Sequence, residues 1–313
     1  MTGQPSAALQ VFDAEATGAL LPAAALLDAV AEAMRARRAG RLTAPERCVI
    51  PLPEGGSYLV MPAADDRLAI TKLLTVHPGH AVRGLPTIQG QVVVADARDG
   101  RPLMLLDGPT LTARRTAAVT ALGLRVLSTK PVRSVALLGT GAQALAHARV
   151  LAELGEVRAL HVVGRTTAQA DAFADRLAAE LGGVELTAHA HLADALRTAQ
   201  AVVTLTTSLR PVLPDELPAG LLVIGVGAFT PQMAELPRAL LRSRRVVVDA
   251  LDGARHEAGD LIQAAIEWSG VTELVDHLDA RPGSGPAAVL KTVGHAAWDL
   301  AAAHVARRML APS

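Results

Sequence analysis

The spacing of apolar residues predicts one long helix near the start of the chain, followed by a sheet. Over 22–38, Leu26, Val30 and Met34 recur every four residues, and the segment ends in basic residues and Gly40, as helices commonly do. Short apolar runs interrupted by Pro and Gly then predict strands at 48–52, 57–61, 68–74, 89–95 and 102–106. We therefore expect an antiparallel or mixed sheet after the helix, with the helical pattern returning at 110–127.

Beyond Arg133 the pattern alternates between short apolar runs and amphipathic segments. The runs predict strands at 133–138, 158–163, 184–188, 200–206, 221–226 and 244–249. Helical segments separate most of them, notably 142–154, 167–181 and 191–198. Strands that are apolar at nearly every position are typical of a parallel sheet covered on both faces. This part of the chain therefore predicts an α/β domain with a doubly wound parallel sheet.

The change of pattern divides the chain into two domains, which suits a length of 313 residues. We expect the doubly wound sheet to form one domain over 119–286, with a Pro-Gly-Ser-Gly-Pro loop at 282–286. The rest, 1–118 with 287–313, is expected to form an α+β domain, because a last helix at about 286–310 would pack back on the first sheet.

Composition and charge exclude several classes of protein. Half of the residues are hydrophobic and 19% are charged, which suits a globular protein with a large core. Lys+Arg and Asp+Glu are both 30, and a net charge of zero gives no overall attraction to nucleic acids or anionic membranes. The first basic residue is Arg35, and no apolar run is long enough to span a bilayer. We therefore expect a cytoplasmic protein with neither nucleic acid nor membrane as a partner.

The cysteine and histidine residues do not show the spacing of a metal site. Cys48 is the single cysteine, which excludes an intramolecular disulfide and any site with several cysteine ligands. We interpret it as a small buried residue of its strand. The ten histidines include no pair spaced on a helix with a nearby Glu, as zinc hydrolases use. The sequence therefore predicts no metal.

A glycine-rich turn follows the first strand of the parallel sheet and opens a helix. Residues 139–144 read Gly-Thr-Gly-Ala-Gln-Ala, which is the G-x-G-x-x-A pattern of dinucleotide-binding domains. In this pattern the glycines allow a tight turn and a close approach of the backbone to a pyrophosphate, which the helix N-terminus stabilises. The domain over 119–286 is therefore expected to be a Rossmann dinucleotide-binding domain. The candidate cofactor-binding residues of this turn are Gly139, Thr140, Gly141, Ala142 and Gln143.

The end of the second parallel strand indicates which dinucleotide binds. Sites that prefer NAD usually carry Asp or Glu there, but this chain has Arg165 and Thr166, and its next acid is Asp171. Arg165 can pair with a 2′-phosphate, and Thr166 can donate a hydrogen bond to it. We therefore expect NADPH as the cofactor, with NADH possible; the alternative is that Arg165 is a solvated loop residue.

Basic residues in the first domain are candidates for the chemistry. Lys72 interrupts an apolar strand, which is unfavourable unless its side chain faces a polar cavity, where a lowered pKa would suit proton transfer. Arg47 precedes another apolar strand, and Arg114 and Arg115 lie near the start of a helix. Two arginines at one cavity can hold a carboxylate. Spacing alone does not distinguish these residues from surface charges.

Residues 111–118 resemble the L-T-x-x-R-T-A-A signature of the ornithine cyclodeaminase/μ-crystallin family. Further matches run in order from about residue 20 to 305, and include Pro45-Glu46-Arg47, Lys72, Gly139 to Ala144, Thr206-Thr207-Ser208 and Val293-Gly294-His295. The resemblance implies a homodimer. Its first domain, completed by the C-terminal helix, would bind the substrate and form the dimer interface.

The resemblance also implies roles for single residues. Arg47 and Arg115 would hold the substrate carboxylate, and Lys72 would be the active-site lysine near the reacting C–N bond. The implied substrate pocket contains Met61, Phe229 and His295. Further cofactor contacts would come from Thr206, Thr207, Ser208 and Val226.

The family contains several activities, so membership alone does not decide the function. Where the cyclodeaminases and the archaeal alanine dehydrogenases carry an acid/base Asp, this chain has Phe229, which cannot transfer a proton. Its Gly-Ala-Phe-Thr-Pro stretch and Gly84-Leu85-Pro86-Thr87 resemble bacterial Δ1-pyrroline-2-carboxylate/Δ1-piperideine-2-carboxylate reductases. We expect an NADPH-dependent ketimine reductase that forms L-proline and L-pipecolate from these cyclic imines. The alternatives are an ornithine cyclodeaminase, an amino-acid dehydrogenase of the same family, and a non-catalytic μ-crystallin-like binding protein.

Overall fold

The computed structural model describes residues 9–280 and 287–311. The chain divides into two compact units: unit 1 is Met1–Arg115 with His295–Ser313, and unit 2 is Thr116–Gly294. The second boundary differs from the expected position at 287, because β14 (Val289–Lys291) pairs with strands of the unit 2 sheet. The loop expected at 282–286 lies outside the described residues.

Unit 1 is built on a mixed sheet with the strand order β1-β6-β5-β4-β3-β2. Its strands are β1 (Gln10–Val11), β2 (Cys48–Pro51), β3 (Ser57–Ala64), β4 (Leu68–Val76), β5 (Ile88–Asp96) and β6 (Pro102–Asp107). Neighbouring strands are antiparallel except for β1, which runs parallel to β6. The 3-10 helices η1 (Pro53–Gly55) and η2 (Pro78–Arg83) lie in the hairpin loops. The expectation of an antiparallel or mixed sheet is confirmed.

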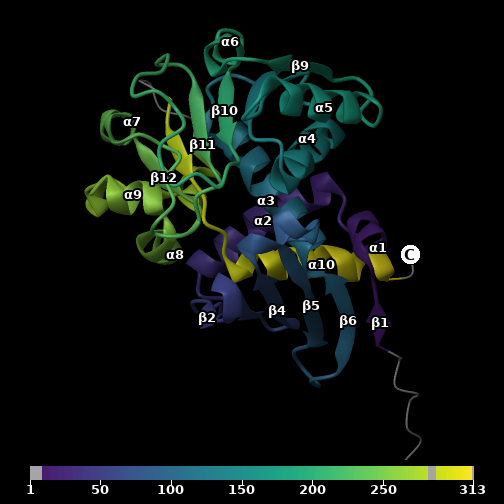
Figure 1. The fold of residues 1–313 in the computed structure, drawn as a ribbon. Coiled ribbons are helices and arrows are strands. Elements are labelled where there is room, and N and C mark those ends of the chain that lie inside the picture. Colours follow the sequence, from purple (N-terminus) through teal and green to yellow (C-terminus); the bar gives the residue numbers. More distant parts are fainter. Residues whose placement is uncertain (1–8, 281–286, 312–313) are drawn as a thin grey trace, which may run out of the picture. The chain divides into compact units, whose positions relative to one another are not determined.

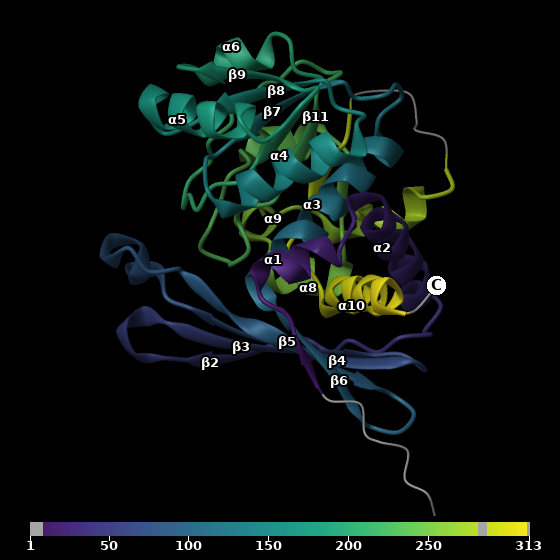
Figure 2. The same cartoon turned by 90° about the vertical axis from the view of Figure 1, so that its right-hand side faces the viewer.

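Helices cover one face of this sheet (Figure 2). The elements are α1 (Ala14–Ala19), α2 (Ala23–Arg38), the start of α3 (Gly108–Leu127) and α10 (Ala296–Leu310). The helix α10 packs against α2 and crosses β3 and β4. Because side chains alternate along a strand, every second residue, such as Ile70 and Val92, is buried on this face. The intervening residues point to the opposite face, on which Figure 2 shows no described helix of unit 1.

Unit 2 contains the doubly wound sheet, with the strand order β13-β12-β14-β11-β10-β7-β8-β9 (Figure 1). Besides β14, its strands are β7 (Ser134–Leu138), β8 (Ala159–Val163), β9 (Glu185–His189), β10 (Ala201–Thr204), β11 (Leu222–Gly225), β12 (Val246–Val248) and β13 (Thr272–Glu273). Every pairing described in this sheet is parallel. The chain leaves β7 toward β8 on one side and later places β10 on the other. The switch point, where doubly wound folds bind ligands, thus lies between the carboxyl ends of β7 and β10.

Helices precede and connect the parallel strands. They are the rest of α3, α4 (Ala142–Leu154), α5 (Thr167–Ala178), α6 (Leu192–Leu196), α7 (Arg238–Ser243), α8 (Leu251–Glu257), α9 (Gly259–Gln263), η3 (Trp268–Gly270) and η4 (Leu274–His277). The strands β7, β8, β10 and β11 are buried at nearly every position, as their apolar sequences predicted. The expectation of a doubly wound Rossmann sheet is confirmed.

Two expectations are wrong. The last helix begins at Ala296 rather than at about 286, because β14 occupies part of that stretch. A buried strand of three residues is too short to show periodicity in a region rich in alanine. The side chain of Cys48 is exposed rather than buried, because β2 is the edge strand of its sheet.

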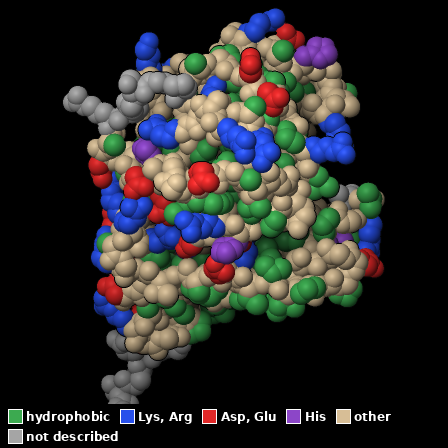
Figure 3. Space-filling model, turned by 90° about the vertical axis from the view of Figure 1, so that its left-hand side faces the viewer, with side chains coloured by type: hydrophobic (Ala, Val, Ile, Leu, Met, Phe, Trp, Pro, Cys, Tyr) green, Lys and Arg blue, Asp and Glu red, His purple; other side chains and the backbone are tan. Residues whose placement is uncertain are grey.

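The surface agrees with the even charge balance of the chain. On the face shown in Figure 3, acidic and basic side chains are interspersed with apolar ones. Among the described residues, no helix has both the length and the apolar character that crossing a bilayer requires.

Candidate active site

A buried charge cluster lies in unit 1, where α10 crosses the sheet. Lys72, in β4, is 1% exposed, and its Nζ lies 2.7 Å from Oδ2 of Asp299 in the first turn of α10. Nε of Arg115, in α3, donates to the other oxygen of Asp299 at 2.8 Å. Asp299 has no exposed surface. One carboxylate therefore holds the lysine and the arginine in fixed positions.

Burial and mutual attraction shift the protonation of this cluster in opposite directions. Loss of water around the ammonium lowers the pKa of Lys72 to about 8; the charge of Asp299 opposes this shift, and the charges of Arg115 and Arg47 add to it. Burial would by itself raise the pKa of Asp299, but Lys72 and Arg115 outweigh it and hold that pKa below 3.8. Lys72 can thus gain and lose a proton near neutral pH, as a general acid requires.

Two other candidates lie beside Lys72. Met61, in β3, is the register partner of Lys72 and is 3% exposed, so its side chain lies on the same face of the sheet. Arg47 directly precedes β2, and its positive charge acts on Lys72. Arg114 has a different position, since its Nε donates to the Leu21 carbonyl at 2.8 Å and connects α3 to the segment before α2.

His295 lies at the N-terminus of α10. Its Nδ1 accepts a hydrogen bond from the Ala297 backbone N–H at 3.2 Å, which caps the helix. It also lines an open hollow of about 530 Å³, together with Arg37 and Arg38 from the last turn of α2. Phe229, the third residue of the expected substrate pocket, is half-buried in unit 2, in the loop after β11.

Sequence reasoning missed Asp299, which is the centre of the buried cluster. A signal was present, because Asp299 is the single charged residue in the apolar stretch 296–303. An acid in an apolar helix and a lysine in an apolar strand each need a partner of opposite charge. Pairing the two by this argument would have selected Asp299.

The glycine-rich turn in unit 2 is shaped to receive a phosphate group. Gly139 ends the β7 segment with φ +130°, and a Cβ there would lie 2.7 Å from the Leu205 carbonyl oxygen. Gly141 is the N-cap of α4, no side chain caps that helix, and a Cβ on Gly141 would meet nothing within 4 Å. Gly141 and Ala142 are exposed, and among the described residues no side chain caps the first N–H groups of α4, so this turn fits the pyrophosphate of a dinucleotide. Thr140 lies within the turn, and Ala142 and Gln143 form the start of α4.

The loop after β8 carries the residues that were expected to bind the ribose 2′-phosphate. Arg165 is exposed just after β8, and Thr166 is the N-cap of α5, where its hydroxyl accepts from the Gln169 N–H at 3.3 Å. The preceding Gly164 is tightly packed, since a Cβ there would lie 3.0 Å from the Thr166 carbonyl oxygen. Neither Asp nor Glu occurs between β8 and α5.

The remaining candidates lie in the loops at the carboxyl ends of β10 and β11. Thr206 is half-buried, Thr207 is exposed, and the hydroxyl of Ser208 donates to the Arg210 carbonyl at 2.6 Å. Val226 is buried and its N–H donates to the Thr204 carbonyl at 3.0 Å. These loops follow neighbouring strands, and β10 borders the switch point.

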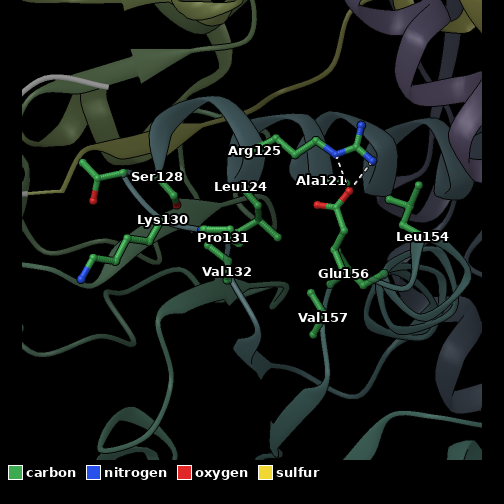
Figure 4. A pocket seen from close by; sticks show the side chains of 12 residues that line it. Ala121, Leu124, Arg125, Ser128, Lys130, Pro131, Val132, Leu154, Glu156 and Val157 are labelled. Atoms are coloured by element: carbon green, nitrogen blue, oxygen red, sulfur yellow. Dashed lines mark hydrogen bonds and ion pairs between the residues drawn. The ribbon is translucent and has the colours of Figure 1, made fainter. Parts of the chain in front are cut away.

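Unit 2 contains a further pocket of about 260 Å³ near the amino end of β7 (Figure 4). Leu124, Val132 and Leu154 line it, and the ion pair of Arg125 with Glu156 lies beside them. Gly139 lies at the opposite end of β7, so this pocket is separate from the glycine-rich turn. In the described part of the chain, no group of three or more His, Cys, Asp or Glu residues is arranged to hold a metal ion.

The chain is similar to several known proteins over most of its length. The sequence is 47% identical over 301 residues to Delta(1)-pyrroline-2-carboxylate reductase 1 of Burkholderia multivorans, covering 96% of each chain. It is 46% identical to the Delta(1)-pyrroline-2-carboxylate/Delta(1)-piperideine-2-carboxylate reductase of Azospirillum brasilense, covering 97% of this chain and 96% of the relative. It is 31% identical to the ketimine reductase mu-crystallin of Mus musculus, covering 84% of each chain.

A solved structure has the same fold over nearly the whole chain. The Thermococcus litoralis Delta(1)-pyrroline-2-carboxylate reductase, in complex with NADH and L-proline, superposes with a TM-score of 0.84 at 22% identity over 96% of each chain. The sequence also matches the ornithine cyclodeaminase/mu-crystallin family over residues 9–308. With the bacterial relatives at 46–47% identity, this match shows that the chain belongs to the ornithine cyclodeaminase/mu-crystallin family.

Proposed function

We propose that the protein is a nicotinamide-dependent ketimine reductase. Its substrates are Δ1-pyrroline-2-carboxylate and Δ1-piperideine-2-carboxylate, and its products are L-proline and L-pipecolate. The observation that carries this proposal is the buried cluster of Lys72, Asp299 and Arg115. The bacterial relatives with 46–47% identity, which are named as reductases of these imines, support it over nearly the full length of the chain.

Arg115 and Arg47 bind the substrate carboxylate in this proposal. Asp299 engages Nε of Arg115, which leaves the two terminal nitrogens of the guanidinium to donate to a carboxylate. Because Arg115 is only 5% exposed, water competes weakly for these donors. The carboxylate would then fix the neighbouring imine carbon in one orientation.

Lys72 supplies a proton to the imine nitrogen in this proposal. Reduction of a cyclic imine adds a hydride to the carbon and requires a proton on the nitrogen, so the iminium is the reactive form. When bound, the nicotinamide cofactor supplies the hydride. With a pKa of about 8, Lys72 is largely protonated at neutral pH and can donate this proton. Asp299 holds the Nζ of Lys72 in place. Met61 gives the neighbouring wall an apolar character suited to the ring.

The cofactor is proposed to be NADPH. The loop after β8 has no carboxylate to accept from a ribose 2′-hydroxyl, and it presents the exposed Arg165 to a 2′-phosphate.

Phe229 supports reduction over cyclodeamination, because a phenyl group cannot take the proton that amine release requires. The dinucleotide and the imino acids are cytoplasmic metabolites, and we propose that the protein acts there.

We also propose that two copies associate through the open face of the unit 1 sheet. Among the side chains on this face, Val11 is 66% exposed and Ile50 is 46% exposed, and Leu73 and Val93 lie between them on β4 and β5. Exposed apolar side chains on an uncovered sheet face are unfavourable in water. A second copy of the same sheet would cover it with matching apolar residues.

One assay tests the function and the cofactor together. Purified protein is mixed with each imine and with NADPH or NADH, and nicotinamide absorbance and the chirality of the product are followed. We expect consumption of NADPH with formation of L-proline and L-pipecolate. In Arg165→Ala, the KM for NADPH should rise about tenfold while that for NADH changes little, because one charged hydrogen bond is lost. Ammonia release from L-ornithine without imine reduction would instead support the cyclodeaminase.

A further inference from the structure

A single buried carboxylate joins the loops at the carboxyl ends of β10 and β11. Glu235 has no exposed surface. Its Oε1 accepts from the backbone N–H of Thr206 at 2.7 Å and from the Thr206 hydroxyl at 2.8 Å. Its Oε2 accepts from the Thr204 hydroxyl at 2.9 Å and from the N–H groups of Gly227 at 2.7 Å and Ala228 at 3.1 Å. Five donors, from the last residue of β10 and from the two loops, thus converge on one side chain.

The two loops lie so close together that no side chain would fit at Gly227. A Cβ on Gly227 would lie 2.0 Å from the Thr206 carbonyl oxygen and 2.6 Å from Oε1 of Glu235. On the other side of the same segment, a Cβ on Gly139 would lie 2.7 Å from the Leu205 carbonyl oxygen. The segment 204–206 is therefore held between the glycine-rich turn and the Gly227 loop. A shift of this segment would disturb both of its neighbours.

Glu235 is itself held by a second buried group. The backbone N–H groups of Glu235 and Leu236 donate to Oδ1 of Asp260 at 2.5 and 2.8 Å. Oδ2 of Asp260 lies 3.1 Å from Nζ of Lys291, which also donates to the Gly225 carbonyl at 3.3 Å. Asp260 and Lys291 are 1% and 0% exposed. Buried charges are costly unless they are paired, so the ion pair of Asp260 with Lys291 has few alternative arrangements.

We propose that Glu235 is a positioning residue for the dinucleotide. It sets the spacing between the loops after β10 and β11, and through the segment 204–206 it sets their spacing from the Gly139 turn. Glu235 does not touch the ligand and acts through Thr206 and Gly227. Loops that are already ordered bind a ligand without the entropic cost of ordering them. The proposal rests on the proposed function in one respect, namely that the ligand at this edge of the sheet is a nicotinamide dinucleotide.

The variant Glu235→Gln tests the proposal. Gln has the same shape as Glu, but one of its two terminal atoms is an amide nitrogen. This nitrogen donates where a carboxylate oxygen accepts, so the N–H and O–H groups that point at this atom lose their acceptor. A buried donor without an acceptor is unfavourable, and the loops should separate to relieve it. We expect the Kd of the dinucleotide to rise about tenfold, measured by titrating NADPH and NADH fluorescence in the absence of imine. With saturating cofactor, kcat should fall much less than the Kd rises.

Thr204→Val provides a milder second variant. Thr204 is fully buried in β10 and its hydroxyl donates to Glu235, so it cannot contact a ligand directly. Valine has the same shape and suits a strand. We expect the Kd to rise about threefold, since one of the five hydrogen bonds is lost. The matched control is Glu216→Gln, at an exposed position in the same unit, which should bind like the wild type.

The outcomes separate this proposal from the proposed function. If the wild type binds neither NADPH nor NADH, the proposed function is overturned. If the wild type binds and both variants fold but bind within twofold of it, the positioning role of Glu235 is overturned. A lower Tm with an unchanged Kd counts against the role as well, because a purely structural group would give that result. If Glu235→Gln does not fold, the Kd of Thr204→Val decides.

Discussion

Asp299 sets the charge balance of the candidate active site. Its two oxygens bind Lys72 and Arg115, so the buried cluster has two positive charges and one negative charge. The carboxylate raises the pKa of Lys72, while burial, which is the larger cause, lowers it. Removing the negative charge of Asp299 should therefore lower the pKa of Lys72 further and also release the arginine that is proposed to bind substrate.

The pH dependence of imine reduction should reveal this balance. If protonated Lys72 is the acid, kcat/KM falls as pH rises through about 8, because the ammonium loses its proton there. In Asp299→Asn this decline should move to lower pH by about one unit or more. The ionisation of the imine is common to all variants, so only an enzyme group can cause the shift. The control Asp66→Asn, at an exposed position, should keep the wild-type profile. An unmoved decline in Asp299→Asn would exclude Lys72 as the acid.

The helix α10 is the element that completes the site, because it carries both Asp299 and the cap residue His295. Side-chain contacts hold its second half against the β3–β4 loop and the end of β5. Nε2 of His304 lies 2.6 Å from Oδ2 of Asp65, between β3 and β4, and Arg307 pairs with Asp96 at 3.1 Å. These contacts hold the helix against the strands from which Lys72 projects, so they stabilise the position of Asp299.

The contact of Asp65 with His304 should make a pH-dependent contribution to stability. Burial opposes ionisation of Asp65, but hydrogen bonds from the Leu68 and Arg67 N–H groups, together with His304, lower its pKa below 3.8. Such a group stabilises the fold above its unfolded pKa, and this contribution is lost as pH falls through the lower folded value. Asp65→Asn should therefore reduce the free energy of unfolding by about 1 kcal/mol at pH 7.

Urea unfolding measured from pH 7 downward checks this expectation. Asn keeps an oxygen for the two backbone N–H groups, so the variant removes mainly the charge and the His304 contact. The difference between Asp65→Asn and the wild type should be present at pH 7 and shrink below about pH 4. A difference that is the same at every pH would show that the charge of Asp65 does not contribute. The neighbouring Asp66→Asn serves as the control.

As an assembly, the protein is expected to depend on the open sheet face of unit 1. Association through a standard interface buries about 800 Å² on each partner, and an apolar sheet face is suited to this. Val93→Lys places a charge near the middle of the face and should raise the dimer dissociation constant about a hundredfold. Met309→Lys, at another exposed apolar position, is the matched control. Light scattering and sedimentation equilibrium measure the mass; a monomeric wild type, or a dimeric Val93→Lys, would contradict the proposal.

Local patterns in the sequence were sufficient for most of the fold. The alternation of apolar runs and amphipathic segments after Arg133 predicted the parallel sheet, because strands buried on both faces are apolar at nearly every position. The turn at Gly139 was recognisable because its function depends on backbone geometry that only glycine allows. The boundary at β14 and the exposure of Cys48 were missed, since both depend on which strands are neighbours in the sheets.

The charge networks were decided by tertiary contacts. Arg115 and Asp299 are 184 positions apart along the chain, and neither periodicity nor motif spacing connects them. The five donors to Glu235 include three backbone N–H groups, which are present at almost every residue and carry no sequence signal. Sequence patterns report local backbone preference and burial. The direction of a side chain toward a distant partner depends on the packing of the whole fold, and this packing determines the pKa of Lys72 and the spacing of the cofactor loops.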